Sequence, residues 1–414
     1  MVDEGAGRAS RDRYDVVVAG ASFAGLVAAI EAAAAGATVA VIDPHAVGTG
    51  QTSACATTLA VLDALGARSA IQQVHREMVV HLAPAHGTAP RALAYRLPYG
   101  WATFDYRDLC LILKERGAAA GVEFVRARVT GGRADEVRTD RGVIGAGIAI
   151  DAAGWRAPLA SAIDPAHVRR DQLSCGLEAE VPQPRTSPAS GLHFWAGHGT
   201  VWPGYGWAFP AGQTSRIGVL AFAKAGGGAG NASPSGRLRS DLDAFLNGPV
   251  SGMWSPDGGE PWAARHVGTG QAPTRTMVAG APMHLHGGFI PCAPRRPVVG
   301  GVLCVGDAAG HCFGLTAEGI RAAMTFAVRA GQVAGGVAAG RWDAAEACAI
   351  YGRFAGARWP YFTLMRWLQR FVGALGDGGL HAYARAARPW PIFHFLMAQY
   401  RWAADPVPLL DRST

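Results

Sequence analysis

Lysine is almost absent from this sequence of 414 residues, in which only Lys114 and Lys224 occur, so arginine supplies nearly all of the positive charge. The formal net charge of +7 is scattered along the chain, without a basic run or a basic stripe interleaved with aromatic residues. Nucleic-acid binding is therefore not expected. The excess of positive charge is compatible with an anionic ligand or with an acidic membrane surface.

Closely spaced cysteines and long apolar runs are missing as well. The seven cysteines lie far apart with no C-x-x-C pair, which argues against a disulfide framework or a zinc site and indicates a reduced, cytoplasmic setting. The histidines show no H-E-x-x-H or similar spacing, so no metal site is predicted. The apolar stretch 25–42 is interrupted by Glu31 and Gly36, and the first 13 residues are polar. Neither a membrane span nor a signal peptide is expected.

The first chemical signal is a strand–turn–helix unit near the N-terminus. The apolar run 16–19 ends at Gly20, and Ser22 and Gly25 complete a G-x-S-x-x-G pattern before an alanine-rich segment. Glycine permits a tight turn and close approach of a pyrophosphate, and the N-terminus of the following helix offers N–H groups to the phosphates. Asp43 ends the next strand, where a carboxylate accepts the ribose hydroxyls of an adenosine. We expect dinucleotide binding at this turn.

A second strand that ends in glycine occurs far along the chain. In the segment 304–311 the strand runs into Gly306, and Asp307 follows at once. The Asp307 carboxylate suits a ribityl hydroxyl, which flavin cofactors carry and nicotinamide cofactors lack. Gly319 lies at the start of the next predicted helix, whose N-terminal dipole would favour an anionic reduced flavin by about 1 kcal/mol. Together the two turns predict FAD as the bound dinucleotide.

These turns and a third motif carry a resemblance to a known class of proteins. Residues 20–25, the D-A-A-G segment 151–154 and the G-D-A-A-G segment 306–310 resemble, in this order, the FAD-binding signatures of glutathione-reductase-like flavoproteins. That class includes aromatic hydroxylases, flavin-dependent halogenases, lycopene cyclases and geranylgeranyl reductases. The resemblance covers residues 14–340 and implies that Gly154 lies at the cofactor.

The segment 205–210, Y-G-W-A-F-P, resembles the Y-x-W-x-F-P motif of geranylgeranyl reductases. In that family the aromatic pair lines the isoprenoid tunnel beside the isoalloxazine, which implies the same role for Tyr205 and Trp207. The flat apolar faces of the two rings suit an alkene chain held against a flavin. Halogenases carry W-x-W-x-I-P and an active-site lysine after the second strand, and this sequence matches neither, so halogenation is disfavoured. The alternative for the pair is a core strand that packs its own aromatic side chains.

Three further residues are candidates through the same resemblance. Arg107 fits an arginine that contacts the cofactor early in a helix; an ordinary surface arginine is the alternative. Cys55 lies where several geranylgeranyl reductases place a cysteine close to the flavin, although the glycines that flank it in the family are missing here; a buried structural cysteine is the alternative. His311, next to the G-D-A-A-G segment, is a candidate proton donor, and a structural histidine is the alternative.

The C-terminal stretch 354–368 mixes aromatic residues with arginine. Such a stretch either rests on a lipid surface as an interfacial helix or packs on its own protein. We favour packing, with the stretch closing one end of the substrate cavity. Contact with a membrane surface, and with it a peripheral membrane location, is the less favoured alternative.

The patterns predict an α/β fold: a Rossmann-type FAD-binding domain, an inserted antiparallel β-sheet substrate domain and a helical C-terminal cap. The expected boundaries are a flexible tail at 1–13, the FAD-binding domain at 14–170 and 295–340, the substrate domain at 171–294 with a contribution from about 86–105, and the helical region at 341–414.

The predicted activity is that of an FAD-dependent oxidoreductase, which reduces a C=C bond of a small apolar, prenyl-like substrate by hydride transfer from reduced flavin. A flavin-dependent monooxygenase is the main alternative. A halogenase, a non-redox flavin cyclase and a protein that holds FAD without turnover are less favoured. Because the sequence has no second glycine-rich dinucleotide turn, the electrons are expected from NAD(P)H or from a reduced partner such as a ferredoxin or a flavin reductase.

Overall fold

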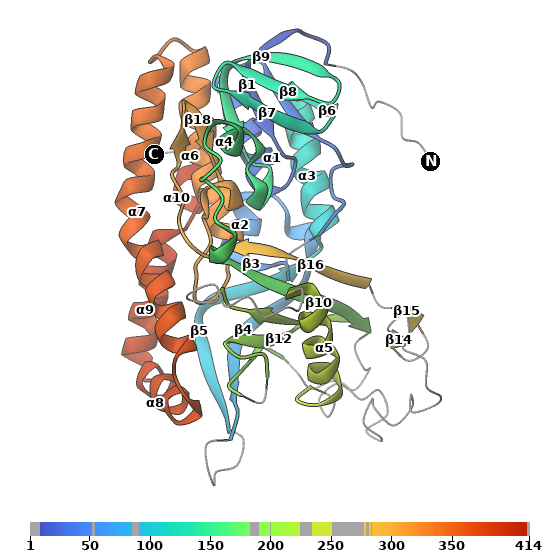
Figure 1. The fold of residues 1–414 in the computed structure, drawn as a ribbon, viewed down its shortest axis with the longest axis vertical. Helices are drawn as coiled ribbons and strands as arrows, with labels where there is room; N and C mark the ends of the chain where they lie inside the picture. The colour runs from blue at the N-terminus through green and yellow to red at the C-terminus, as the bar shows by residue number, and fades with distance from the viewer. Residues whose placement is uncertain are drawn as a thin grey trace.

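The computed structural model describes residues 9–51, 54–84, 91–182, 190–198, 200–223, 234–250, 277–278, 281–282 and 284–411. Two eight-stranded sheets and a group of C-terminal helices form its three parts (Figure 1). Of the predicted tail at 1–13, residues 1–8 lie outside the described residues.

The first sheet is built around parallel strands and has the order β17-β18-β9-β1-β2-β6, with β7 and β8 attached beside β9. Its strands are β1 (Arg13–Ala19), β2 (Val39–Asp43), β6 (Glu123–Arg126), β7 (Val129–Arg133), β8 (Glu136–Thr139), β9 (Gly142–Asp151), β17 (Val298–Val299) and β18 (Val302–Cys304). The central strand β1 pairs in parallel with β2 and with β9, and Val16, Val17 and Val18 are fully buried. A β-branched strand buried on both faces is typical of a parallel sheet that is covered by helices.

Two of the helices, α1 and α6, pack closely against each other because small residues lie at their contact. The described helices are α1 (Phe23–Ala33), α2 (Leu59–Ala64), α3 (Tyr106–Ala119), α4 (Pro158–Ile163), α5 (Pro234–Asn247), α6 (Ile320–Ala338), α7 (Ala344–Gly373), α8 (Asp377–Ala387), α9 (Trp390–Ala403) and α10 (Val407–Leu410). The alanine-rich α1 lies against α6. A Cβ atom at Gly331 of α6 would stand 2.3 Å from the carbonyl oxygen of Ala28, so the two helices approach almost to backbone contact.

The second sheet is mostly antiparallel and has the order β16-β10-β13-β12-β11-β4-β5-β3. Its strands are β3 (Ala56–Thr58), β4 (Ile71–Leu82), β5 (Arg91–Phe104), β10 (Leu173–Pro182), β11 (Leu192–Ala196), β12 (Gly204–Ala211), β13 (Thr214–Ala221) and β16 (His284–Pro291), and a separate pair is formed by β14 (Met277–Val278) and β15 (Ala281–Pro282). The contribution of β3, β4 and β5 begins at Ala56, earlier than the expected 86–105. The reason is that these strands return between β2 and α3, where local patterns give no sign of a change of sheet.

The third part consists of α7, α8, α9 and α10, and α7 to α9 stand together along one side of the molecule (Figure 1). The long helix α7 begins at Asp343, whose side chain accepts a hydrogen bond from the backbone N–H of Glu346, as an N-cap residue does. Among the described residues no helix is long and apolar enough to cross a membrane. The predicted α/β fold with its Rossmann-type part, antiparallel sheet and C-terminal helices is confirmed.

Candidate active site

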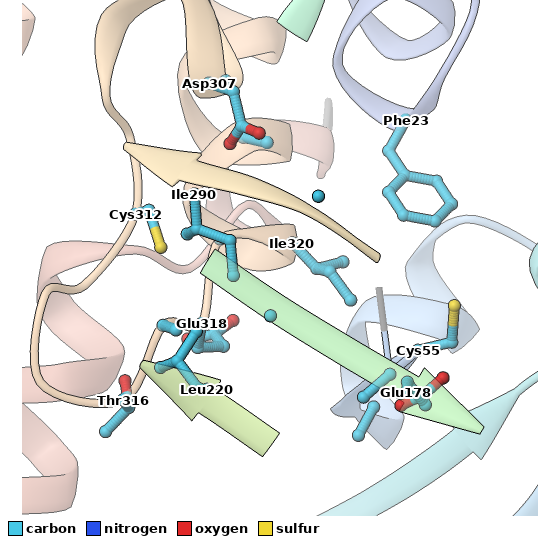
Figure 2. Close-up of a pocket in the computed structure, with 18 of the residues that line it drawn as sticks. Phe23, Cys55, Glu178, Leu220, Ile290, Asp307, Cys312, Thr316, Glu318 and Ile320 are labelled. Atoms are coloured by element: carbon cyan, nitrogen blue, oxygen red, sulfur yellow. The ribbon is translucent and has the colours of Figure 1, made fainter. Parts of the chain in front are cut away.

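A cavity of about 1270 Å³ lies between the two sheets and extends to the C-terminal helices. Its wall combines the two glycine turns of the first sheet with side chains from the second sheet and from α7, α8 and α9. In Figure 2, Asp307 stands toward one end of the view and Glu178 and Cys55 toward the other, with Ile320 between them. A largely apolar cavity with a few polar groups is typical of a site for a cofactor and a small molecule.

The turn after β1 requires glycine at two positions, because the backbone there passes too close to other backbone groups for a side chain. Gly20 has a φ of +102°, and a Cβ atom there would stand 2.4 Å from the carbonyl oxygen of Ala152. At Gly25, a Cβ would stand 1.8 Å from the oxygen of Gly20, so only glycine lets α1 start directly behind the strand. Ser22 is the N-cap of α1, yet its side chain makes no capping hydrogen bond. The N–H groups of the first turn are therefore available to an anion.

Asp43 at the end of β2 organises the same turn. Its Oδ2 accepts a hydrogen bond of 2.9 Å from the N–H of Ala21, and its Oδ1 accepts one of 2.8 Å from the N–H of His45. A carboxylate can accept about four hydrogen bonds in all, so Asp43, which lines the cavity, retains the capacity to bind hydroxyl groups of a ligand.

The turn after β18 presents the second carboxylate. Gly306 has a φ of +59°, and Asp307 follows it at the cavity wall. Among the described residues no hydrogen-bond donor meets the Asp307 carboxylate, and burial raises its pKa to about 6, opposed by the positive charge of Arg295. The Arg295 guanidinium instead donates 2.8 Å and 3.1 Å hydrogen bonds to the carbonyl oxygens of Trp155 and Asp307. A half-buried carboxylate at the cavity wall that meets no donor of the protein can accept a hydrogen bond from a hydroxyl group of a ligand.

The remaining predicted cofactor residues lie in different surroundings. Gly154 follows β9 with a φ of +77°, and Gly319 is the N-cap of α6; both line the cavity. Arg107 is exposed and lies next to Gly48, outside the cavity wall. The cradle at Gly20, the uncapped start of α1 and the donor-free carboxylate of Asp307 together fit a dinucleotide with a ribityl chain.

The aromatic pair of the Y-G-W-A-F-P segment lies on β12 and lines the cavity. The rings of Tyr205 and Trp207 meet edge to face with centroids 6.1 Å apart, a favourable geometry for aromatic pairs. The Tyr205 hydroxyl donates a hydrogen bond to the carbonyl oxygen of Thr316. The Trp207 ring lies over Gly218, where a Cβ atom would stand 2.1 Å from the ring. The pair is thus both packed and in contact with the cavity.

Glu178 on β10 is a cavity residue that the sequence analysis missed. Its side chain is buried, and its Oε2 accepts a 2.8 Å hydrogen bond from Nε1 of Trp207. Its Oε1 is buried without a hydrogen-bond partner in the described structure. Burial raises the pKa of the carboxyl to about 7, against the opposing effects of Arg216 and of the Trp207 hydrogen bond. The only signal in the sequence is a glutamate within the segment 175–179, which has no other polar side chain apart from a cysteine.

Arg216 on β13 is the charged neighbour that supports this carboxyl group. It is almost fully buried and donates hydrogen bonds of 3.2 Å and 2.9 Å to the carbonyl oxygens of Ala54 and Phe104. A third bond, of 2.8 Å, reaches the side-chain oxygen of Gln72. These contacts hold a positive charge next to Glu178 and tie β13 to the segment around Cys55.

The two other catalytic candidates differ in position. Cys55 is buried, has a φ of +51° and lines the cavity. His311 does not line the cavity; its ring stacks on Phe326 with centroids 3.6 Å apart. Burial lowers the pKa of His311 to about 3, so the ring stays neutral near pH 7. In this position His311 is a core residue, and we do not propose it as a proton donor.

The stretch 354–368 forms part of α7 and presents two different faces. Tyr361, Met365 and Leu368 line the cavity, so the stretch closes one of its ends as the sequence predicts. Trp359, Leu364 and Trp367 from the same stretch are exposed. Packing on the protein therefore accounts for only one face of α7.

Comparisons with known proteins agree with this geometry. Residues 15–169 match the family of FAD dependent oxidoreductases. The chain is 28% identical over 343 residues to digeranylgeranylglycerophospholipid reductase 1 of Methanopyrus kandleri, with 78% of this chain and 80% of that protein covered.

Solved structures show the same fold. A geranylgeranyl bacteriochlorophyll reductase-like protein from Thermoplasma acidophilum superposes with a TM-score of 0.70 at 18% identity, covering 89% of this chain and 90% of that chain. The myxobacterial chondrochloren halogenase gives 0.62 at 17% identity, with 86% and 82% covered. A probable FAD-dependent monooxygenase from Pseudomonas aeruginosa gives 0.60 at 16% identity, with 87% and 96% covered. The chain is therefore an FAD-dependent oxidoreductase, and its fold is the one that the geranylgeranyl bacteriochlorophyll reductase-like protein, the halogenase and the monooxygenase have in common.

Proposed function

We propose that this oxidoreductase saturates a carbon–carbon double bond of an apolar, prenyl-like substrate. The observation that carries the proposal is the apolar wall of the cavity beyond the aromatic pair. Six of its members, from the second sheet and the C-terminal helices, are Leu97, Leu192, Leu220, Leu368, Val372 and Phe393. Such a wall gains free energy from covering hydrocarbon, roughly 25 cal/mol for each Å² removed from water. The similarity to the Methanopyrus kandleri reductase supports the same substrate class.

FAD, when bound, supplies the hydride, and the protein supplies binding and orientation. We propose that the N–H groups at the start of α1 bind its phosphates and that Asp43 and Asp307 accept hydrogen bonds from its hydroxyls. Gly154 and Gly319 leave space at the cavity wall. Tyr205 and Trp207 would hold the alkene in a fixed pose, which matters because errors of about 1 Å in position can cost about a hundredfold in rate.

Saturation of an alkene needs a proton for the second carbon, and we propose Glu178 as its donor. Oε2 already accepts the Trp207 N–H bond, so the proton of the neutral carboxyl is expected on Oε1, which has no protein partner. A carboxyl with a pKa of about 7 still carries its proton in a substantial fraction of molecules at neutral pH. A general acid works best with a pKa near the working pH. Cys55, at the same side of the cavity, is the alternative donor.

The source of the electrons is part of the same proposal. The sequence contains no second glycine-rich dinucleotide turn after a strand. We infer that NAD(P)H in transient contact or a reduced partner protein, such as a ferredoxin or a flavin reductase, reduces the bound flavin. Anaerobic mixing of the yellow protein with each donor, followed through the flavin absorbance, distinguishes them by rate.

The test of the function uses the FAD-loaded protein, reduced under anaerobic conditions and offered a geranylgeranyl lipid. Mass spectrometry should show the gain of two hydrogen atoms at each reduced bond. In D₂O up to two deuterium atoms should enter there, one from the proton donor and one through the hydride, because the N5–H of a reduced flavin exchanges with solvent. Glu178→Gln should lower this turnover strongly, whereas the control Glu180→Gln should not. Glu180 lies on the same strand outside the cavity wall and accepts a 2.8 Å hydrogen bond from Thr214. Unchanged lipid would contradict the proposed reduction. An oxygenated product under air would favour the monooxygenase alternative.

A further inference from the structure

The outer side of the C-terminal helices is unusually apolar for a surface. Of the twelve exposed large hydrophobic side chains in the described structure, nine lie on α7 and α9. We call these nine residues the aromatic face: Trp359, Leu364, Trp367, Phe371, Trp390, Ile392, Phe395, Leu396 and Trp402. Single exposed apolar residues are normal, but a gathering of this kind marks an interaction site.

One ring contact within α7 and one contact between α7 and α9 involve members of the aromatic face. Trp367 and Phe371 stack one helical turn apart with centroids 5.4 Å from each other. The guanidinium of Arg358 on α7 lies 5.9 Å from the ring centroid of Trp402 on α9. Figure 1 shows α7, α8 and α9 grouped on one side of the molecule, and the nine residues of the aromatic face lie on α7 and α9 of this group.

The charge around the aromatic face is mostly positive. Between residues 347 and 404 the chain carries seven arginines and one acidic residue, Asp377. Arg353, Arg370, Arg385 and Arg388 are exposed. Tryptophan and phenylalanine interspersed with arginine is the composition of segments that lie in the headgroup layer of a bilayer. An anionic surface would complement the arginines, and the effect would weaken as salt is added.

The aromatic face is continuous with the substrate cavity. Leu396 belongs to both, because its side chain is 42% exposed and also lines the cavity. Phe393 and Met397 of α9 line the cavity from within, as does Tyr383 of the neighbouring α8. One end of the apolar cavity is therefore walled by the helices that present the apolar surface.

We propose that α7, α8 and α9 dock on the surface of an anionic lipid bilayer, so that the end of the cavity at Leu396 faces the lipid. The partner is a membrane surface rather than a membrane interior, since the aromatic face covers the sides of helices that do not span. The evidence for docking comes only from the helices. Its role depends on the proposed function, because a prenyl substrate dissolved in the bilayer would reach the cavity without crossing water. For the stretch 354–368, the docking adds contact with a lipid surface on the exposed face to the packing against the cavity on the other face.

The experiment uses the full FAD-loaded chain and vesicles of phosphatidylglycerol and phosphatidylcholine, with binding measured by co-sedimentation. The protein should bind vesicles rich in phosphatidylglycerol, and binding should fall with added salt. Trp390→Ala combined with Phe395→Ala should lower the affinity at least tenfold. Both side chains are 63% exposed, so folding should be unaffected. The control Val143→Ala changes an equally exposed apolar residue, 59% exposed on β9, and should bind as the wild type does.

Three outcomes would overturn the docking. One is failure of the wild-type protein to bind any vesicle, and another is equal binding by the Trp390/Phe395 variant. The third is a stable dimer in analytical ultracentrifugation that the same two substitutions dissociate, because the face would then cover a second copy. Turnover of a short, water-soluble prenyl alcohol is measured in parallel. Normal turnover without vesicle binding would reject the docking alone, and vesicle binding without turnover would reject the proposed function alone.

Discussion

Replacing Glu178 by glutamine tests the environment of the proposed proton donor through the stability of the protein. Glutamine keeps the shape and accepts the Trp207 hydrogen bond, but it does not ionise. Burial raises the pKa of Glu178 from 4.5 to about 7. Between these values the unfolded chain has lost the proton that the folded protein retains, so unfolding releases a proton and rising pH favours unfolding.

The size of the effect follows from this difference in pKa. One pKa unit corresponds to about 1.4 kcal/mol, so ionisation of Glu178 removes roughly 3 kcal/mol from the free energy of unfolding as the pH rises from below 4.5 to above 7. About 2–3 kcal/mol of this loss should fall between pH 5 and pH 8. Burial also raises the pKa values of Asp151 and Asp307 to about 6. Ionisation of these two residues therefore also lowers the free energy of unfolding over part of the same pH range. They are present in both proteins, and their contribution cancels in the comparison.

The assay is denaturant unfolding of the wild-type protein and of Glu178→Gln at pH 5 and pH 8, at one fixed concentration of FAD. The wild-type protein should lose about 2–3 kcal/mol more than the variant between the two pH values. At neutral pH the variant should be the more stable protein and the slower catalyst, with turnover lower by about 10²–10⁴-fold. Glu180→Gln should stay close to the wild type in both measurements, because Glu180 has the smallest effect among the groups that shift the pKa of Glu178. An equal loss of stability in wild type and variant would refute the raised pKa and with it the argument for Glu178.

Three further changes test other parts of the site. Trp207→Phe removes the N–H that stabilises ionised Glu178, so the pKa should rise further and the high-pH fall in turnover should move to higher pH, measured as a pH–rate profile. Asp307→Ala should weaken FAD binding by about tenfold to a hundredfold, as followed by flavin fluorescence, whereas Asp171→Ala at the surface should not. Gly25→Ala places a methyl group 1.8 Å from the Gly20 oxygen and should yield colourless protein, because the phosphate turn and α1 no longer meet; yellow protein with normal affinity would contradict this.

The cofactor half of the molecule could be predicted from sequence because its signals are local. Gly20, Gly25 and Asp43 act within one strand–turn–helix–strand unit, and Gly306 and Asp307 are adjacent, so neighbours in sequence are neighbours in space. The substrate half could not be predicted in the same way. The properties of Glu178 depend on Trp207 and Arg216, which reach it from other strands of the second sheet.

His311 is a residue for which a local sequence pattern predicts the wrong surroundings. Its sequence position next to Gly310 suggests the flavin, but the chain turns there, and the ring points into the core against Phe326. Which way a side chain faces at such a turn depends on α6 and α7, which follow later in the chain. The same is true of α7, whose aromatic residues divide between cavity and surface according to the packing of α8 and α9.

The path of the chain between the two sheets has a consequence for folding and for proteolysis. The chain forms β1 and β2 in the first sheet, crosses to β3–β5 in the second and returns for β6–β9. It crosses again for β10–β13 and β16, and it ends with β17 and β18 back in the first sheet. No contiguous piece of the polypeptide contains one of the two sheets in full without strands of the other. Folding must therefore bring together segments separated by more than a hundred residues, which is slow and cooperative. A truncated or divided gene would consequently yield no flavin-binding fragment, and limited proteolysis would release no stable half.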